Sequence, residues 1–266
     1  MVNQVNLLEI AKLHRINEGL MVEGLHGETE SYFGGSQRWL RTQNGKQGGC
    51  GTVTGANILA YLAMTQKNLR PLFRYPKLDM VHYVQHLEEV YHVLTPISLE
   101  QIHHRLPVWL QKKMAPSLGI PGIAFFSKRV CRFAVKRERN LQPVWVDRKG
   151  RPSHNTNLHL SMDKAVEYIR EGLASGCPVA MLNGLNPRLK KIPYTGRTGS
   201  QGEGNFQRHW VTITGLYSDV ESGDILLEVA SWGYKALLSF QDFWGKGYTA
   251  FVYFTASSSA AVSEDH

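Results

Sequence analysis

Cys50 and His209 are the two residues whose types and positions best equip this chain for chemistry. Cys50 follows a glycine-rich stretch and directly precedes an apolar segment with the pattern of a buried helix. The dipole and free amides of a helix start lower the pKa of a cysteine thiol, and the same amides can hold a developing oxyanion. We therefore predict that Cys50 is a nucleophile, whereas Cys131 and Cys177 fit the packing role of a buried cysteine.

His209 is the predicted partner of Cys50. It opens the segment HWVTITG directly after a long glycine-rich and basic loop, residues 183–208. A thiol nucleophile needs a base within hydrogen-bond reach, and usually a third group that orients the imidazole. Ser231 directly follows a later predicted strand and can accept from the second ring nitrogen, while Trp232 can shield that bond from water. The predicted constellation is Cys50, His209 and Ser231.

These residues carry a family resemblance. The string Gln47–Gly51 before an apolar helix, the later string His209–Val211 and the string Ser231–Gly233 resemble the papain-like cysteine peptidases. The closest similarity is to their bacterial branch, the bacteriocin-processing (double-glycine) peptidases and their uncharacterised relatives. In that branch a Cys-Gly pair starts the buried helix, and a histidine begins a strand two strands before a Trp-Gly turn. The resemblance covers residues 34–254, although residues 66–161 match nothing.

Two departures from the papain pattern concern the nucleophile and the orienting residue. A strict papain register places the nucleophile at Val53, whereas the bacterial register places it at Cys50. We prefer the second register, because a disulfide-type cysteine has little reason to occur at Cys50 without secretion. The papain pattern has asparagine where this chain has Ala230, and Ser231 is the nearest substitute.

The resemblance also implies a glutamine that helps to hold the oxyanion, about six residues before the nucleophile. Asn44 occupies that place. Gln37, in a Gly-Gly-x-Gln block, is the first choice for this role and Gln43 the second. The groove for the substrate is expected to include the glycines and tryptophans beside the dyad, namely Gly49, Gly51, Trp210 and Trp232.

His82 and His86 form a second, weaker constellation. They are four residues apart on a predicted helix, which is the spacing of two metal ligands on one face. The glutamate that a hydrolytic zinc motif carries between its two histidines is absent. We interpret both as ordinary, partly exposed helix histidines, and we expect no metal site and no cofactor.

The elements that must position these residues follow from periodicity and capping. Helices are predicted over 6–20, from Cys50 through the apolar segment, over 78–94, over 99–114 with Ser98 as cap and a kink or break at Pro107, and over 162–174 with Ser161 as cap. Strands are predicted over 124–134, 142–146, 177–182, 210–217, 225–230, 235–239 and 250–254. Residues 32–49 are predicted to be a loop.

Helices followed by antiparallel strands indicate an α+β protein. The resemblance implies a papain-like arrangement, in which an N-terminal helical lobe with a long buried helix starting at the nucleophile packs on a C-terminal antiparallel sheet. We expect one domain with two lobes over residues 1–255 and a disordered tail over 256–266.

Composition narrows the class of protein. The chain has 266 residues, 42 % hydrophobic residues and a formal net charge of +8. Its apolar runs are too short to span a bilayer, and no secretory leader is visible, so we expect a cytoplasmic protein without a membrane partner. Basic residues gather in 128–151 and 188–197. We interpret them as a solvated face or an attraction for acidic substrates, and consider a nucleic-acid partner unlikely.

Three functions are compatible with these residues. The first is a cysteine hydrolase acting on a peptide, isopeptide or related amide bond through a Cys50 thioester, or an acyltransferase that uses the same thioester. The second is a papain-like binding module with impaired catalysis, which the alanine at position 230 suggests. The third is a nucleic-acid-associated protein, which would show a steep salt dependence. The identity of the substrate and the oligomeric state stay open.

Overall fold

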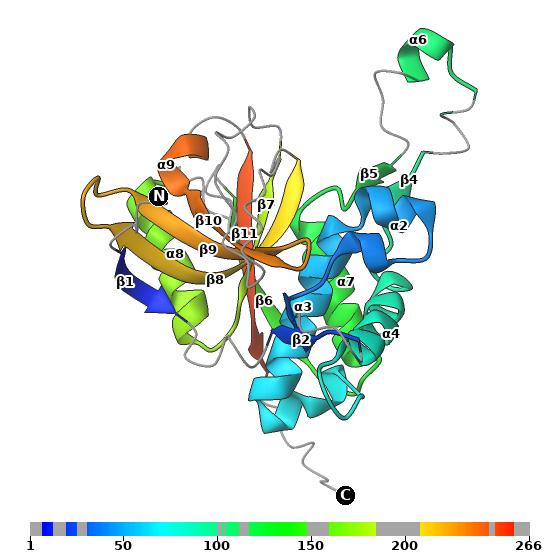
Figure 1. Cartoon of the computed structure of the whole chain (residues 1–266), viewed down its shortest axis with the longest axis horizontal. Helices are drawn as coiled ribbons and strands as arrows, with labels where there is room; N and C mark the ends of the chain where they lie inside the picture. The colour runs from blue at the N-terminus through cyan, green and yellow to red at the C-terminus, as the bar shows by residue number, and fades with distance from the viewer. Residues whose placement is uncertain are drawn as a thin grey trace, which may run out of the picture.

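The computed structural model is a mixed α+β protein in which a seven-stranded sheet lies beside a group of helices (Figure 1). It describes residues 7–12, 20–25, 31–99, 103, 105–111, 117–147, 160–184, 208–244 and 248–257. The predicted α+β class is confirmed. Within the described ranges, no helix is both long enough and apolar enough to cross a membrane.

The large sheet is built from antiparallel pairs in the order β10-β9-β8-β7-β11-β6, and β1 pairs with a separate part of β8. Its strands are β1 (Leu7–Lys12), β6 (Leu141–Asp147), β7 (Val179–Asn183), β8 (His209–Asp219), β9 (Ile225–Ser231), β10 (Tyr234–Ser239) and β11 (Thr249–Ala256). Six of these seven strands were predicted within a few residues. His209 is the first residue of the central strand β8, and the end of the predicted tail, 258–266, lies outside the described residues.

The helix predicted over residues 6–20 is wrong where the structure describes it. Residues 7–12 form β1, which pairs with Gly215–Asp219 of β8, and residues 13–19 lie outside the described ranges. The neighbouring strand β7 pairs with β8 only as far as Ile213. The remaining edge of β8 therefore offers unpaired backbone groups to β1, and this tertiary pairing overrides a weak helical spacing.

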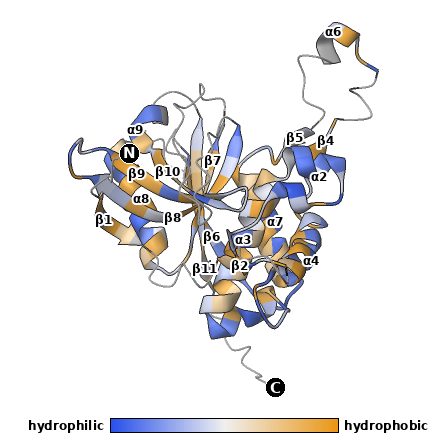
Figure 2. Ribbon diagram, in the orientation of Figure 1, coloured by the Kyte–Doolittle hydropathy of each residue, from blue (hydrophilic) through white to orange (hydrophobic). Residues whose placement is uncertain are grey.

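Three predicted helices are present: α3 (Cys50–Thr65), α4 (Met80–Tyr91) and α8 (Met162–Ala174). Residues 51–63 of α3 are all buried, as its lack of charge predicted. Helix α8 begins where Ser161 Oγ accepts from the Lys164 N–H, and the left-handed Gly176 follows its end. Helix α3 packs against β8 on one side and α4 and α7 on the other. Figure 2 shows hydrophobic and hydrophilic residues alternating around α4.

The strand predicted over 124–134 is instead a helix, α7 (Ile123–Val135). Its buried side chains include Ile123, Phe126, Val130 and Phe133, which follow the three- and four-residue spacing of one helix face. The aromatic and β-branched residues that favour a strand are therefore the core-facing stripe of a helix. Packing of that stripe against α3 and β6 decides the outcome.

The prediction for residues 32–49 needs correction. The loop predicted over 32–49 contains a 3-10 helix, η1 (Gln37–Trp39), and α2 (Gln43–Gly48), whose N-cap Thr42 accepts from the Gly45 N–H. Of the helix predicted over 99–114, the structure describes a helical His103, whose N–H donates to Leu99, and α6 (Val108–Gln111) after Pro107, while 100–102, 104 and 112–116 lie outside the described residues. Ser98 belongs to β4 (Ile97–Ser98), which pairs with β5 (Ser117–Gly119). The shorter elements are β2 (Met21–Glu23), β3 (Ser31–Phe33), η2 (Lys67–Leu72) and α9 (Phe240–Phe243).

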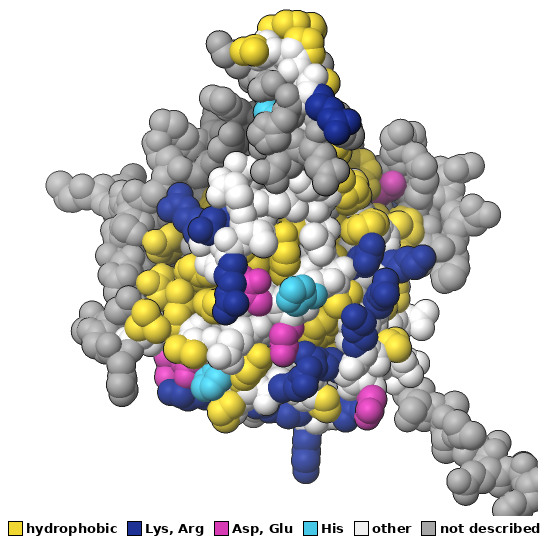
Figure 3. All heavy atoms as spheres, turned by 90° about the vertical axis from the view of Figure 1, so that its right-hand side faces the viewer, with side chains coloured by type: hydrophobic (Ala, Val, Ile, Leu, Met, Phe, Trp, Pro, Cys, Tyr) yellow, Lys and Arg dark blue, Asp and Glu magenta, His cyan; other side chains and the backbone are white. Residues whose placement is uncertain are grey.

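The outer face of α7 is basic. Lys128, Arg132 and Lys136 recur every fourth residue and are exposed, and none of them forms an ion pair with another described residue. Figure 3, which views the helical side of the molecule, shows Lys and Arg side chains gathered along one flank. The second predicted basic stretch, 188–197, lies outside the described residues.

Candidate functional site

The start of α3 is packed so closely that the residues flanking Cys50 have no room for a side chain. A Cβ built on Gly51 would lie 2.5 Å from the side chain of Ile120, and one built on Gly48 would lie 2.0 Å from Oγ of Ser117. Contacts this short are not found for real Cβ atoms, so either substitution forces a neighbour to move. The glycines near Cys50 therefore admit β5 and the residue that follows it.

One small pocket collects most of the residues predicted for the site. It is lined by Gln37, Cys50, Val53, Thr54, His209, Trp210, Ala230, Ser231 and Trp232. The centre of a water-sized sphere can move within ≈ 10 Å³ of this pocket, so the pocket has room for about one water molecule. Gln43 does not line it, and is exposed at the start of α2. Gly49 and Gly51 are buried beside Cys50 but do not line it.

The imidazole of His209 is held on two sides. Its Nε2 lies 2.7 Å from Oγ of Ser231, and the ring of Trp232 stacks on it with centroids 4.3 Å apart and an interplanar angle of 21°. Ser231 thus occupies the place that the sequence predicted for it. The contact with Nε2 directs Nδ1 to the other side of the ring, so the tautomer and orientation of His209 depend on Ser231.

Trp232 reaches this position from an unusual backbone conformation. It is followed by Gly233 in the turn between β9 and β10, where Ser231 pairs directly with Tyr234. The φ angles of Trp232 and Gly233 are 52° and 83°, as in the type I′ turns of two-residue hairpins. Asparagine or glycine is usual at the first position, and a bulky residue there is strained. The strained turn directs the indole onto His209.

Burial dominates the electrostatics of the pair. Desolvation lowers the pKa of His209 to about 3, because the charged imidazolium is unfavourable away from water. Burial raises the pKa of the Cys50 thiol, opposed by the backbone N–H groups of Trp210, Gly51 and Cys50. The sequence-based expectation of a lowered thiol pKa is therefore wrong for this structure. The helix-start amides act in the expected direction, but burial outweighs them, and the resting pair is a neutral thiol and a neutral imidazole.

Gln37 enters the pocket from η1. Its Nε2 donates to the carbonyl oxygen of Lys46, at 2.8 Å, while its Oε1 is buried without a hydrogen-bond partner among the described residues. The residues that precede η1, Gly34 and Gly35, permit a close approach to α3 and α4. A Cβ on Gly35 would lie 2.4 Å from the ring of Tyr83.

Asn57 joins the segments that carry the site, and sequence reasoning missed it. It lies seven residues after Cys50 on α3 and is buried. Its Oδ1 accepts from the Gly35 N–H at 2.9 Å and from the hydroxyl of Tyr83 at 2.5 Å. Its Nδ2 donates to Oγ1 of Thr212 on β8, at 3.1 Å. A lone amide side chain within an uncharged, wholly buried helix was the available signal.

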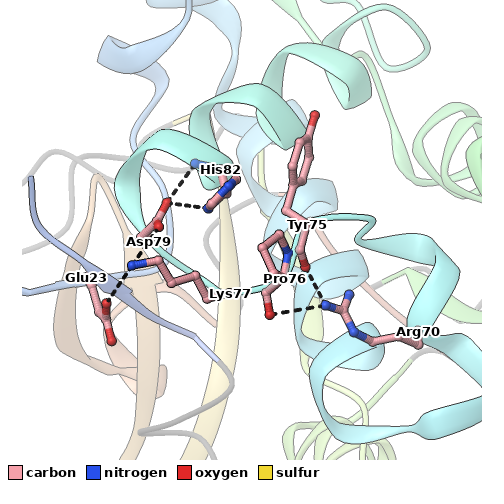
Figure 4. A network of polar contacts seen from close by, with 7 residues as sticks. All are labelled: Glu23, Arg70, Tyr75, Pro76, Lys77, Asp79 and His82. Carbon is pink, nitrogen blue, oxygen red and sulfur yellow. Dashed lines mark hydrogen bonds and ion pairs between the residues drawn. The ribbon is translucent and has the colours of Figure 1, made fainter.

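The two histidines of α4, His82 and His86, contact different partners. His86 is fully buried, with Nε2 3.2 Å from the carbonyl oxygen of Ala56, and burial lowers its pKa to about 4. The expectation of a partly exposed residue is wrong for His86. His82 Nδ1 lies 2.8 Å from Asp79, which also caps α4 and pairs with Lys77 at 3.2 Å (Figure 4). Within the described residues no cluster of three potential metal ligands occurs.

Figure 4 also shows the polar contacts that fix the chain before α4. Lys77 lies 3.8 Å from Glu23 of β2, whose N–H donates to Leu78. The guanidinium of Arg70 donates to the carbonyl oxygens of Phe73 and Tyr75. These contacts hold the turn between η2 and α4, and they lie outside the lining of the Cys50 pocket.

The other two cysteines have packing environments. Cys131 Sγ donates to the carbonyl oxygen of Leu141 at 3.2 Å, and burial raises its pKa to about 11. Cys177 is fully buried, accepts from the Phe254 N–H at 3.3 Å, and has its pKa raised to about 12 by burial. Such thiols are inert at neutral pH. Comparison of the chain with protein-family models and with characterised proteins found no match.

Proposed function

We propose that the chain is a papain-like cysteine hydrolase that cleaves a peptide, isopeptide or related amide bond through a thioester on Cys50. The observation that carries the proposal is the shared pocket of Cys50 and His209, in which Nε2 of His209 contacts Ser231. A nucleophile, a base and a group that orients the base are the minimum set for acyl transfer.

In the first half of the proposed reaction Cys50 Sγ attacks the carbonyl carbon of the substrate while Nδ1 of His209 takes the thiol proton. The oxyanion that forms accepts from the Cys50 N–H and from Gln37. The amide of Gln37 has two hydrogens on Nε2, and Lys46 engages one of them. The tetrahedral intermediate then collapses, the imidazolium donates its proton to the leaving amine, and an acyl-Cys50 thioester remains.

In the second half a water molecule attacks the thioester and His209 takes a proton from that water. The carboxylic acid leaves, and the thiolate of Cys50 regains a proton from His209. An amine in place of the water gives acyl transfer through the same thioester. Ser231 holds the ring in one orientation through both halves, and Trp232 covers the contact between them.

The resting structure implies that substrate must widen the pocket, because its present volume takes about one water. Opening relieves the burial that lowers the pKa of His209 and raises that of Cys50. The base is therefore stronger in an open, hydrated pocket than in the closed one. The thiol proton is then transferred during the attack itself, so the reaction does not need the lowered thiol pKa that the sequence predicted.

Acylation by p-nitrophenyl acetate tests the proposal. Peptide mass spectrometry should find the acetyl group on Cys50, and His209→Ala should slow acylation by at least about a hundredfold, the usual contribution of a general base. Cys131→Ala is the matched control and should leave the rate unchanged. Acylation confined to Cys131 or Cys177, or a His209→Ala variant as fast as the parent, would contradict the assignment.

A papain-like binding module with impaired catalysis is the second candidate. It is favoured by the neutral resting pair and by Ala230 lining the pocket where the related pattern has asparagine. This candidate predicts that no acyl group accumulates on Cys50 at any pH, and that Cys50→Ala retains the binding of peptide ligands.

A further inference from the structure

The basic face of α7 carries charges that repel one another. We define this face by Lys128, Arg132 and Lys136, which are exposed and four residues apart. Like charges at that spacing lie on one side of a helix and destabilise it. The neighbouring Arg129, by contrast, is engaged, because it donates to the carbonyl oxygen of Val93 at 3.3 Å. The stability of the helix therefore does not explain the three outward cations.

These three cations have no anionic partner within the part of the chain that the structure describes. They extend over about 12 Å of the helix, at a rise of about 1.5 Å per residue. Val135 lies beside them and is 61 % exposed. The acidic Glu138 follows the helix in a left-handed conformation and pairs with none of the three. The basic face is thus a charged surface with an apolar side chain and no described counterpart.

The turn between β8 and β9 has the opposite charge. We define the acidic turn as residues 219–224, which include Asp219, Glu221 and Asp224 and no Lys or Arg. The Asp219 N–H donates to the carbonyl oxygen of Asp224 at 2.8 Å, so the two aspartates lie opposite each other across the hairpin. Like charges in that position are unfavourable. Among the described residues none of the three carboxylates forms an ion pair, and Val220 between them is 63 % exposed.

The basic face and the acidic turn lie too far apart to meet within one molecule. Figure 1 shows the turn between β8 and β9 on one side, near β1, and α7 on the other side. The repulsion within each patch can be relieved only from outside, by a surface of the opposite sign. A second copy of this chain offers such a surface to both patches, and each patch also has an exposed valine to bury.

We propose that the basic face of α7 binds the acidic turn of a second copy of this chain. Three cations then meet three carboxylates, and the two exposed valines pack beside them. Because the patches lie on opposite sides, the contact is head-to-tail and forms a chain or a ring of copies, not a two-fold dimer. Exposed ion pairs are weak and the patches are small, so the association is reversible. A nucleic acid would use the cations but would leave the acidic turn unexplained.

Sedimentation velocity of the full chain tests the proposal. Species larger than the monomer should form at about 100 μM protein in about 0.1 M salt and disappear in about 1 M salt, where the screening length falls from about 10 to about 3 Å. The basic-face variant Lys128→Glu/Arg132→Glu should lower the association constant by about thirtyfold, because two attractions are lost and two repulsions are added, each worth about 2.3-fold at an exposed pair. The turn variant Glu221→Lys/Asp224→Lys should lower it equally. Asp219 is kept, because its carboxylate accepts from the Glu221 N–H at 3.1 Å.

An equal mixture of the two variants is the decisive sample. Each variant alone has like charges on both of its patches and should stay monomeric. In the mixture the patches of one variant are again opposite in charge to those of the other, so association should return. The matched control is Arg38→Glu/Arg41→Glu, which changes the net charge as much as the basic-face variant does, at two exposed arginines outside both patches. It should associate like the parent.

Thermal unfolding verifies that each variant is folded, and if one is not, the other variant and the salt dependence of the parent decide the matter. The proposal is overturned if the parent stays monomeric, if folded variants associate as well as the parent, or if the mixture of two folded variants stays monomeric. It is also overturned if an oligonucleotide or an anionic vesicle binds the basic face while the chain itself stays monomeric. The acylation of Cys50 is measured separately, so neither result decides the other.

Discussion

Acid should destabilise this protein through His86, and the size of the effect follows from its burial. The ring lies among Phe73, Tyr83 and Phe133, at centroid distances of 4.9, 6.2 and 5.9 Å, and burial lowers its pKa to about 4. In the unfolded chain a histidine has a pKa of about 6.5. As pH falls from about 6.5 to about 4, His86 binds a proton in the unfolded state but stays neutral in the folded state. The free energy of unfolding therefore decreases.

The loss amounts to about 1.4 kcal/mol for each pH unit and each proton. Over the whole window His86 alone accounts for about 3 kcal/mol, and His209, with its pKa lowered to about 3, adds a second proton to the slope. The variant His86→Phe keeps an aromatic ring in the aromatic cluster and removes one titrating group. Unfolding of the variant should therefore take up one proton fewer than unfolding of the parent, and its free energy of unfolding should depend less steeply on pH.

Urea unfolding at about pH 7, 6 and 5 measures this slope, with two-state extrapolation at each pH. The difference between parent and His86→Phe should shift in favour of the variant by about 0.7 kcal/mol from pH 7 to pH 6 and by about 1.2 kcal/mol from pH 6 to pH 5. His92→Gln is the control, since His92 is exposed at the end of the same helix, and its slope should match the parent's. Parallel profiles for the parent and His86→Phe would refute the reasoning.

Three further predictions concern the site and its supports. The rate at which iodoacetamide alkylates Cys50 should still rise with pH at about pH 9, because burial raises the pKa of the thiol above its ordinary value of about 8.5. A rate that reaches a plateau below about pH 7 would indicate a thiolate–imidazolium ion pair instead. Asn57→Ala leaves the Gly35 N–H and two other polar groups without their partner, and should lower the free energy of unfolding in urea by about 3 kcal/mol. Tyr83→Phe should lower it by about 1 kcal/mol, and equal losses for the two variants would contradict the network. Gly51→Ala should cost about 1–3 kcal/mol through overpacking, while Gly122→Ala, which meets nothing within 4 Å, should be nearly neutral.

Much of the local structure was predictable because local rules dominated there. Helix α8 begins and ends where Ser161 and Gly176 predicted, since capping and a left-handed stop act within a few residues. Helix α3 was recognisable by its lack of charge over more than three turns. The strands from β7 to β11 were recognisable as apolar runs between turn residues.

The failures share one cause, which is competition from partners distant in sequence. Residues 7–12 became a strand because β8 has an open edge beyond β7. Residues 123–135 became a helix because one apolar stripe fits between α3 and β6. The thiol pKa of Cys50 rose because segments distant in sequence partly bury it, and no local pattern reports that burial.

The sequence by itself determined which residues belong to the candidate site and in what order they occur. Cys50, His209, Ser231 and Gln37 were named from their types, their neighbours and a family resemblance, and the structure places all four in one pocket. Only the tertiary structure decided the direction in which the pKa values of the pair shift and the role of Asn57. These depend on burial and on contacts between segments that are far apart along the chain, and such quantities arise only when the chain is packed.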